Sequence, residues 1–144
     1  MDKNSVARNY SYLTSEIEAA YHEAALKCGL SVSAMRILYV ICLHGEECLL
    51  STVVALSGIS KQTINSALRK LEREGILYLE NTDGRKKRVC LTKKGKEAVQ
   101  HSALRVIKIE NEILNAWTPD ERTAYMTLTE KFLFSFKEKT KELL

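Results

Sequence analysis

The chain has 144 residues, of which 45% are hydrophobic and 28% are charged, a composition that indicates one globular domain and excludes an intrinsically disordered protein. One proline and six glycines favour long helices over many short strands. The first residues carry no apolar run after a basic start, and no stretch reaches the ~18 apolar residues of a membrane span. We therefore expect a cytoplasmic protein with no membrane partner.

Positive charge is unevenly distributed along the chain, although the net charge is only +4. Between Ser60 and Lys96 there are eleven Lys and Arg residues against four Asp and Glu residues, and the rest of the chain is slightly acidic. A local excess of this kind is the electrostatic footprint of a site for a polyanion, with an ordinary solvated surface as the alternative.

The N-terminal part of the chain has the period of helices. Apolar residues recur at intervals of three and four over Ser5–Cys28, which predicts one amphipathic helix. Ser31 or Ser33 can cap a second helix, which ends at Gly45. A short third helix is predicted over Leu49–Leu56.

The pattern then changes from helix to hairpin. A tight turn at Ser57–Ile59 leads into a fourth helix, which Ser60 caps and which stops at Gly75. Two short runs of strand-forming residues follow, Ile76–Leu79 and Arg88–Leu91, separated by turn-forming residues. They predict a β-hairpin with a basic tip.

Two helices are predicted after the hairpin. Thr92 can cap a long helix that extends to about Trp117. A capping box at Thr118–Glu121, with proline at the first helical position, opens the last helix. The order of four helices, hairpin and two helices predicts a mainly α fold with a small β-hairpin wing, which is a winged helix-turn-helix lobe with further helices.

The third and fourth predicted helices, joined by a glycine turn, form a helix-turn-helix. At about 100° per residue, the fourth helix has an apolar face that contains Ile64, Leu68 and Leu71, and a polar face opposite. Arg pairs bidentately with guanine, and Asn or Gln with adenine, so the polar face suits double-stranded DNA, although an ordinary solvated face is the alternative for each residue. The predicted DNA-binding residues here are Ser60, Lys61, Gln62, Thr63, Asn65, Ser66, Arg69, Lys70 and Arg73. We expect three of the cations, Lys61, Lys70 and Arg73, to contact phosphates rather than bases.

The tip of the predicted hairpin carries four cations in succession, Arg85, Lys86, Lys87 and Arg88, just after Asp83-Gly84. Cations on a two-stranded ribbon can lie along a DNA backbone or enter a narrow minor groove, whose negative potential attracts Arg. A charged hairpin that protects an edge strand is the alternative, and it explains four consecutive cations poorly.

Three motifs resemble the MarR family of regulators: the segment Ile59–Ile76 resembles its recognition helix, Asp83-Gly84-Arg85 its D-x-R wing signature, and Leu91–Gly95 its L-T-x-x-G. The resemblance implies a triangular homodimer, joined through the first helix and the last two helices, that binds a pseudo-palindromic operator, usually as a repressor. It also implies that Asp83 braces the wing while Arg85 reaches the DNA.

The resemblance suggests how the chain divides into two functional regions. It also suggests that the protein binds a small molecule. Residues 31–92 are the predicted DNA-binding lobe, and residues 1–28 and 93–144 are the predicted helical dimerisation region. Family members respond to small molecules such as phenolic compounds, so an effector is a possible partner here. Residues that could line its pocket are Tyr10, Tyr21, Tyr39 and Trp117, with packing in the core or dimer interface as the alternative. No motif identifies the effector.

Other classes of function have weaker support. The sequence contains no G-x-S-x-G, no H-E-x-x-H and no Gly-rich phosphate loop, so we predict neither an enzyme nor a cofactor. Cys42–Cys48 packs five potential ligands into seven residues, which leaves a metal-responsive regulator as an alternative. We predict no metal, because Cys42 lies on an apolar stripe. We also predict no sensory cysteine, Cys90 beside the wing being the doubtful case. A winged-helix protein-interaction module is the remaining alternative.

Overall fold

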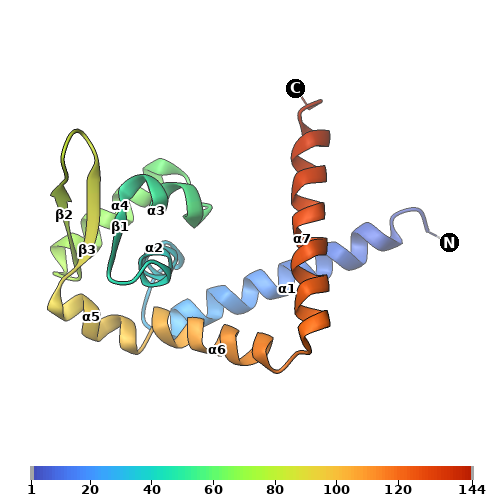
Figure 1. Cartoon of the computed structure of the whole chain (residues 1–144), viewed down its shortest axis with the longest axis horizontal. Helices are drawn as coiled ribbons and strands as arrows, with labels where there is room; N and C mark the ends of the chain where they lie inside the picture. Colours follow the sequence, from blue (N-terminus) through green and yellow to red (C-terminus); the bar gives the residue numbers. More distant parts are fainter. Residues whose placement is uncertain (1, 144) are drawn as a thin grey trace. The chain divides into compact units, whose positions relative to one another are not determined.

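The computed structural model describes residues 2–143 (Figure 1). It divides into two compact units, one that ends at Ile107 and one that begins at Lys108. The elements in chain order are α1 (Ser5–Lys27), α2 (Val32–Leu43), β1 (Glu47–Leu49), α3 (Leu50–Ser57), α4 (Lys61–Arg73), β2 (Leu77–Asn81), β3 (Lys87–Leu91), α5 (Lys93–Gln100), α6 (Ala103–Asn115) and α7 (Pro119–Thr140). The predicted fold class is confirmed: helices dominate, and the sheet is small.

The core of the first unit is built around α2. Ser31, rather than Ser33, caps this helix, because its Oγ accepts a hydrogen bond from the Ala34 amide at 3.1 Å. Ile37, Val40 and Ile41 are at most 2% exposed. Burial of each such side chain contributes roughly 1.5–3 kcal/mol, so α2 is the main hydrophobic anchor of the unit.

The helix-turn-helix follows from two local signals. Gly58 ends α3 with φ of 69°, a left-handed conformation that favours glycine. The Ser60 side chain then caps α4 by accepting from the Thr63 amide at 3.3 Å. The predicted apolar face of α4 is buried, with Ile64 at 0% and Leu68 at 4% exposure.

The sheet contains one strand that the sequence pattern did not indicate. The hairpin of β2 and β3 is present as predicted, and β1 adds to the other edge of β3, so that the strand order is β1-β3-β2. Glu47 pairs with Cys90, and Leu49 pairs with Arg88. A strand of three residues has too few positions to show alternation, and pairing with a segment some forty residues away decides it.

The L-T-x-x-G segment joins the wing to α5. Thr92 donates its amide to the Ile76 carbonyl at 3.0 Å, its hydroxyl lies against the Gly75 carbonyl, and its Oγ1 accepts from the Gly95 amide at 3.0 Å. A Cβ atom at Gly95 would lie 1.9 Å from the Ile76 carbonyl oxygen. Glycine is therefore required here by close backbone approach.

The long helix predicted from Thr92 to Trp117 is wrong, because it is broken into α5 and α6. At the break, the amides of His101 and Ser102 bond three residues back instead of four, to Ala98 and Val99. The Ser102 hydroxyl also donates to the Ala98 carbonyl at 2.9 Å. A serine side chain that competes for a helix carbonyl is a recognised cause of such an interruption.

The second unit consists of the last part of α6 and of α7. The predicted capping box is present: Thr118 Oγ1 accepts from the Glu121 amide, and the Glu121 carboxylate accepts from the Thr118 amide at 2.9 Å. Trp117 packs edge-on against Tyr125, with ring centroids 5.3 Å apart.

Within residues 2–143, no single helix is both long and apolar enough to cross a membrane; α1 and α2 together reach that length and composition only across a 91° bend.

Candidate nucleic-acid interface

The polar face of α4 is fully presented to solvent. All nine residues predicted there to bind DNA are exposed: Ser60, Lys61, Gln62, Thr63, Asn65, Ser66, Arg69, Lys70 and Arg73. The buried Ile64, Leu68 and Leu71 hold the opposite face against the core. The fold therefore fixes the rotation of α4 about its own axis, which is a requirement for a helix whose side chains contact DNA bases.

Two of these nine side chains already make hydrogen bonds within the protein. The Ser60 hydroxyl donates to Thr63 Oγ1 at 2.9 Å and accepts from the Thr63 amide, so both side chains belong to the helix cap. Within the described chain, the side chains of Gln62, Asn65 and Arg69 make no hydrogen bond to other protein groups. These three are the side chains most available for base edges.

The loop of the wing is closed by Thr82, which directly follows β2. Its amide and its hydroxyl both donate to the Lys86 carbonyl at 3.0 Å, and Gly84 takes φ of 87° at the tip. In residues 2–143, the Asp83 side chain makes no hydrogen bond or ion pair, so the bracing role predicted for it stays a prediction that rests on the resemblance. Figure 1 shows the hairpin projecting from the helices at its loop end.

Arg88 differs from the other three cations of the wing. Arg85, Lys86 and Lys87 are exposed, whereas Arg88 is half-buried on β3. Its Nη1 lies 3.3 Å from Glu47 and 3.9 Å from Glu80. The wing therefore presents three unpaired cations and one that is already neutralised. Sequence reasoning missed this pairing because β1, which carries Glu47, was not predicted.

The family comparison covers this region directly. Residues 29–88, which include the helix-turn-helix and most of the wing, match the model of the MarR family. Over this segment the chain is similar to the MarR family.

Solved structures extend the likeness from this segment to nearly the whole chain. A MarR family transcriptional regulator from Silicibacter pomeroyi is 23% identical, with TM-score 0.72 and coverage of 92% of this chain and 93% of that one. A MarR family regulator from Neisseria meningitidis is 17% identical, with TM-score 0.74 and coverage of 97% and 96%. The Bordetella bronchiseptica regulator BpsR, whose DNA binding is regulated by 6-hydroxynicotinic acid, is 20% identical, with TM-score 0.63 and coverage of 86% and 98%. At these identities the likeness shows the fold. No curated protein matches the chain.

The candidate metal ligands of this chain are not arranged as the sequence spacing suggested. Cys42 lies on α2, where burial raises the pKa of its thiol to about 11, and Cys48 lies on β1. Glu47, Glu80 and Cys90 instead come together on the sheet, with their ligand atoms within 4.8 Å of one another. Arg88 already pairs with both carboxylates, so one cation offsets part of the negative charge of this group.

The thiol of Cys90 is held in its protonated form. Burial is the main cause of its raised pKa, and the Glu80 carboxylate adds to it. Since the thiolate is the reactive form of cysteine, this environment disfavours both oxidation and metal binding. The predicted absence of a sensory cysteine stays a prediction, and this geometry supports it.

A cavity of about 370 Å³ lies between α1, α2 and the turn from α3 to α4. Of the four aromatic residues predicted to line a pocket, only Tyr21 does so. Tyr10 is 46% exposed on α1, Tyr39 packs against the core, and Trp117 contacts Tyr125 in the second unit. The grouping of all four residues into one pocket stays a prediction, because helical spacing alone does not tell which face of each helix meets a cavity.

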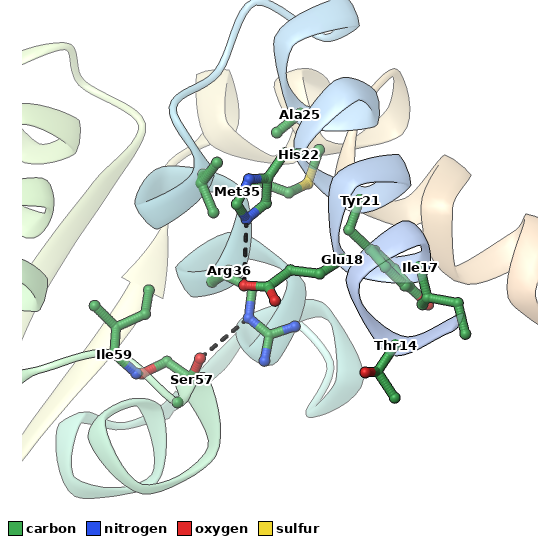
Figure 2. A pocket seen from close by; sticks show the side chains of 12 residues that line it. Thr14, Ile17, Glu18, Tyr21, His22, Ala25, Met35, Arg36, Ser57 and Ile59 are labelled. Carbon is green, nitrogen blue, oxygen red and sulfur yellow. Dashed lines mark hydrogen bonds and ion pairs between the residues drawn. The ribbon is translucent and has the colours of Figure 1, made fainter. Parts of the chain in front are cut away.

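The ionisable residues of the cavity come from α1 and α2 (Figure 2). His22 Nε2 lies 3.8 Å from Glu18 Oε1, both on α1. Arg36 on α2 donates its Nε–H to the Ser57 carbonyl at 3.1 Å. Sequence reasoning missed Arg36, since a single arginine on an apolar helix carries no recognisable motif.

Proposed function

We propose that this chain is a homodimeric transcriptional repressor of the MarR family that binds a pseudo-palindromic operator and is released by a small-molecule effector. The single observation that carries the proposal is the exposed polar face of α4, whose rotation is fixed by its buried opposite face and by the Ser60 cap. A helix presented in this way, followed by a basic hairpin, matches the requirements for reading a DNA groove.

The two parts of the interface have different tasks in this proposal. Gln62, Asn65 and Arg69 read base edges in the major groove. The exposed cations of the wing, Arg85 first, contact the backbone or enter the neighbouring minor groove. Arg88 contributes indirectly, because its pairing with Glu47 and Glu80 holds the wing against the rest of the sheet.

Dimerisation is supported by exposed apolar side chains on the terminal helices. On α1, Val6 is 80% exposed and Leu13 is 51% exposed, and on α7, Leu128 and Phe136 are 62% and 57% exposed. A monomer in water rarely leaves so many large apolar groups uncovered. A two-fold interface that buries them places two copies of α4 on the two halves of a palindrome.

The cavity supports an effector of a particular class. Ile17, Tyr21 and Met35 supply apolar wall, and Arg36 supplies a cation. A planar aromatic acid matches this combination, because its ring fits the apolar wall and its carboxylate pairs with guanidinium. BpsR, which shares the fold, responds to an acid of this kind.

Selection from a pool of random DNA duplexes tests the proposal. The full-length protein should enrich a palindromic sequence, and its affinity should fall steeply as salt rises. Lys137→Ala on α7 is the control, since it removes an exposed cation from outside the interface. Enrichment of nothing, with no salt-dependent binding of any duplex, overturns the proposal and favours a protein-interaction module.

A further inference from the structure

A short connection joins α4 to the wing. Arg73 is the last residue of α4 and Leu77 is the first residue of β2, so the connection consists of Glu74, Gly75 and Ile76. Figure 1 shows β3, the other strand of the wing, running directly into α5 at the end of the hairpin opposite its loop. The path of the connection therefore determines how α4 is oriented relative to the wing.

All three carbonyl groups of this connection accept hydrogen bonds from α5 or its cap. Lys94 on α5 donates from Nζ to the Glu74 carbonyl at 2.8 Å. The hydroxyl of Thr92 donates to the Gly75 carbonyl, and the amide of Thr92 donates to the Ile76 carbonyl at 3.0 Å. The first turn of α5 thus holds the end of α4 at three consecutive residues.

Packing contributes less to this contact beyond the first turn of α5. A cavity of about 120 Å³ lies there, and its wall includes Leu71 and Glu74 from the end of α4 and Ala98 and His101 from the end of α5. Atoms that border a void lose the close contacts that would otherwise fix one element against the other. The hydrogen bonds to residues 74–76 are therefore the main restraint on the end of α4 at this side.

Lys94 is the member of this contact that can be changed without disturbing the fold. Its side chain is exposed, whereas the Thr92 hydroxyl also caps α5 by accepting from the Gly95 amide at 3.0 Å. The last carbonyls of a helix carry partial negative charge, so an ammonium group forms a charge-assisted bond with them. An exposed bond of this kind contributes little to global stability, but it restricts where the end of α4 lies.

We propose that Lys94 is a positioning residue for DNA recognition, which fixes the end of α4 against α5 and thereby sets how Asn65 and Arg69 are presented relative to the wing. This inference rests on the proposed function, because it assigns α4 and the wing to one DNA site. Binding groups must be held within about 0.5 Å of their productive geometry, and base contacts carry the sequence information that phosphate contacts lack. A loosened α4 therefore loses affinity for its operator more than affinity for unrelated DNA.

Lys94→Met tests this role, since methionine keeps an unbranched apolar stem and removes the ammonium group. The affinity of the full-length protein is measured for the duplex enriched by selection and for a scrambled duplex of the same composition, over a range of salt concentrations. The variant should bind the enriched duplex at least about fivefold more weakly, the lower limit of usual coupling between sites, and the scrambled duplex within about twofold of the parent. The salt dependence should not change, because only a lost phosphate contact reduces its slope, by about 1.

Two matched variants separate the bond from the charge. A guanidinium group also donates to a carbonyl, so Lys94→Arg should recover most of the lost affinity. In the part of the chain that the structure describes, the neighbouring Lys93 makes no hydrogen bond or ion pair, and it is equally exposed. Lys93→Met removes the same charge and should leave the ratio of the two affinities within about twofold of the parent value.

Hydrogen exchange provides a second readout that needs no DNA. The amides of Gly75 and Ile76 each bond back to a carbonyl of α4 at 3.0 Å. Lys94→Met should speed the exchange of both amides. The Ile64 amide in the first turn of α4, which the Ser60 carbonyl accepts, should exchange as in the parent protein.

Each contrary result overturns a stated part of the proposal. Equal losses on both duplexes, with a salt slope lower by about 1, would show that Lys94 contacts phosphate instead. Unchanged affinity for the enriched duplex, or a Lys94→Arg protein as weak as Lys94→Met, would overturn the positioning role. Unchanged exchange at Gly75 and Ile76 would show that the bond does not hold the end of α4. A parent protein that binds no duplex would overturn the proposed function itself, while the exchange rates still report whether Lys94 restrains α4.

Discussion

The two compact units of the chain differ in how they are stabilised. Every buried residue of the described chain lies between Ala25 and Ala103, within the unit that carries the helix-turn-helix and the wing. In contrast, α7 has 22 residues and buries none of them. The first unit therefore has a hydrophobic core of its own, whereas the apolar side chains of α7 are left exposed. We infer that folding of the first unit and assembly of the proposed dimer can be disrupted separately.

The largest expected effect is on assembly of the proposed dimer. Phe136→Glu places a charge among the exposed apolar residues of α7 and should weaken the dimer by about 2–4 kcal/mol, the cost of losing an interface hot spot. Sedimentation at micromolar concentration should show monomer, while the first unit keeps its fold. Ser135→Glu, an equal change of charge on the neighbouring exposed position, is the control. A Phe136→Glu protein that stays dimeric would show that α7 does not form the interface.

The next effect is a loss of stability of the first unit, with the apolar face of α7 left unchanged. Gly95→Ala puts a methyl group 1.9 Å from the Ile76 carbonyl oxygen, and the backbone must shift to relieve the clash. The free energy of unfolding should fall by about 3 kcal/mol, at the upper end for overpacking. Chemical denaturation measures this change. Lys93→Ala, an exposed substitution in the same helix, should change stability by less than about 0.5 kcal/mol.

A smaller effect concerns DNA and leaves both units folded. Arg85→Ala removes an exposed cation of the wing and should reduce operator affinity by roughly 1–3 kcal/mol. Thermal melting should remain close to that of the parent, since exposed substitutions shift stability by less than about 0.5 kcal/mol. Equal operator affinity in parent and variant would remove the wing from the mechanism.

The smallest effect lies at the start of α7. Hydrogen bonds from the amide and side chain of Thr118 hold the pKa of Glu121 below its usual value. A carboxyl with a lowered pKa stabilises the folded state above its ordinary pKa, and this contribution is lost as the pH falls through the folded value. The protection of the first-turn amides of α7, measured as exchange relative to the intrinsic rate at each pH, should therefore fall as the solution is acidified below about pH 4.5. Thr118→Ala removes the hydroxyl and keeps the amide, so the pKa of Glu121 should rise only part of the way to its usual value; no rise at all would contradict the part assigned to the side chain.

Much of the candidate interface was predictable from the sequence because its signals are local. The Ser60 cap, the apolar face of α4 and the capping box at Thr118 each depend on residues within a few positions of one another, and all three are confirmed. The β2–β3 hairpin is of the same kind, since turn-forming residues separate two short strands. Such patterns are determined by backbone periodicity and by side-chain bonds to nearby amides.

Tertiary structure alone decided the features that join distant segments. The pairing of Arg88 with Glu47 spans 41 positions in the sequence, and the bond from Arg36 to Ser57 spans 21. The cavity likewise combines faces of α1, α2 and the α3–α4 turn, so the aromatic residues that line it could not be chosen from helical spacing. Sequence determined which side chains are polar and which helices carry them, whereas the packing of those helices determined which polar groups meet, because contacts between remote residues depend on the final positions of both backbones.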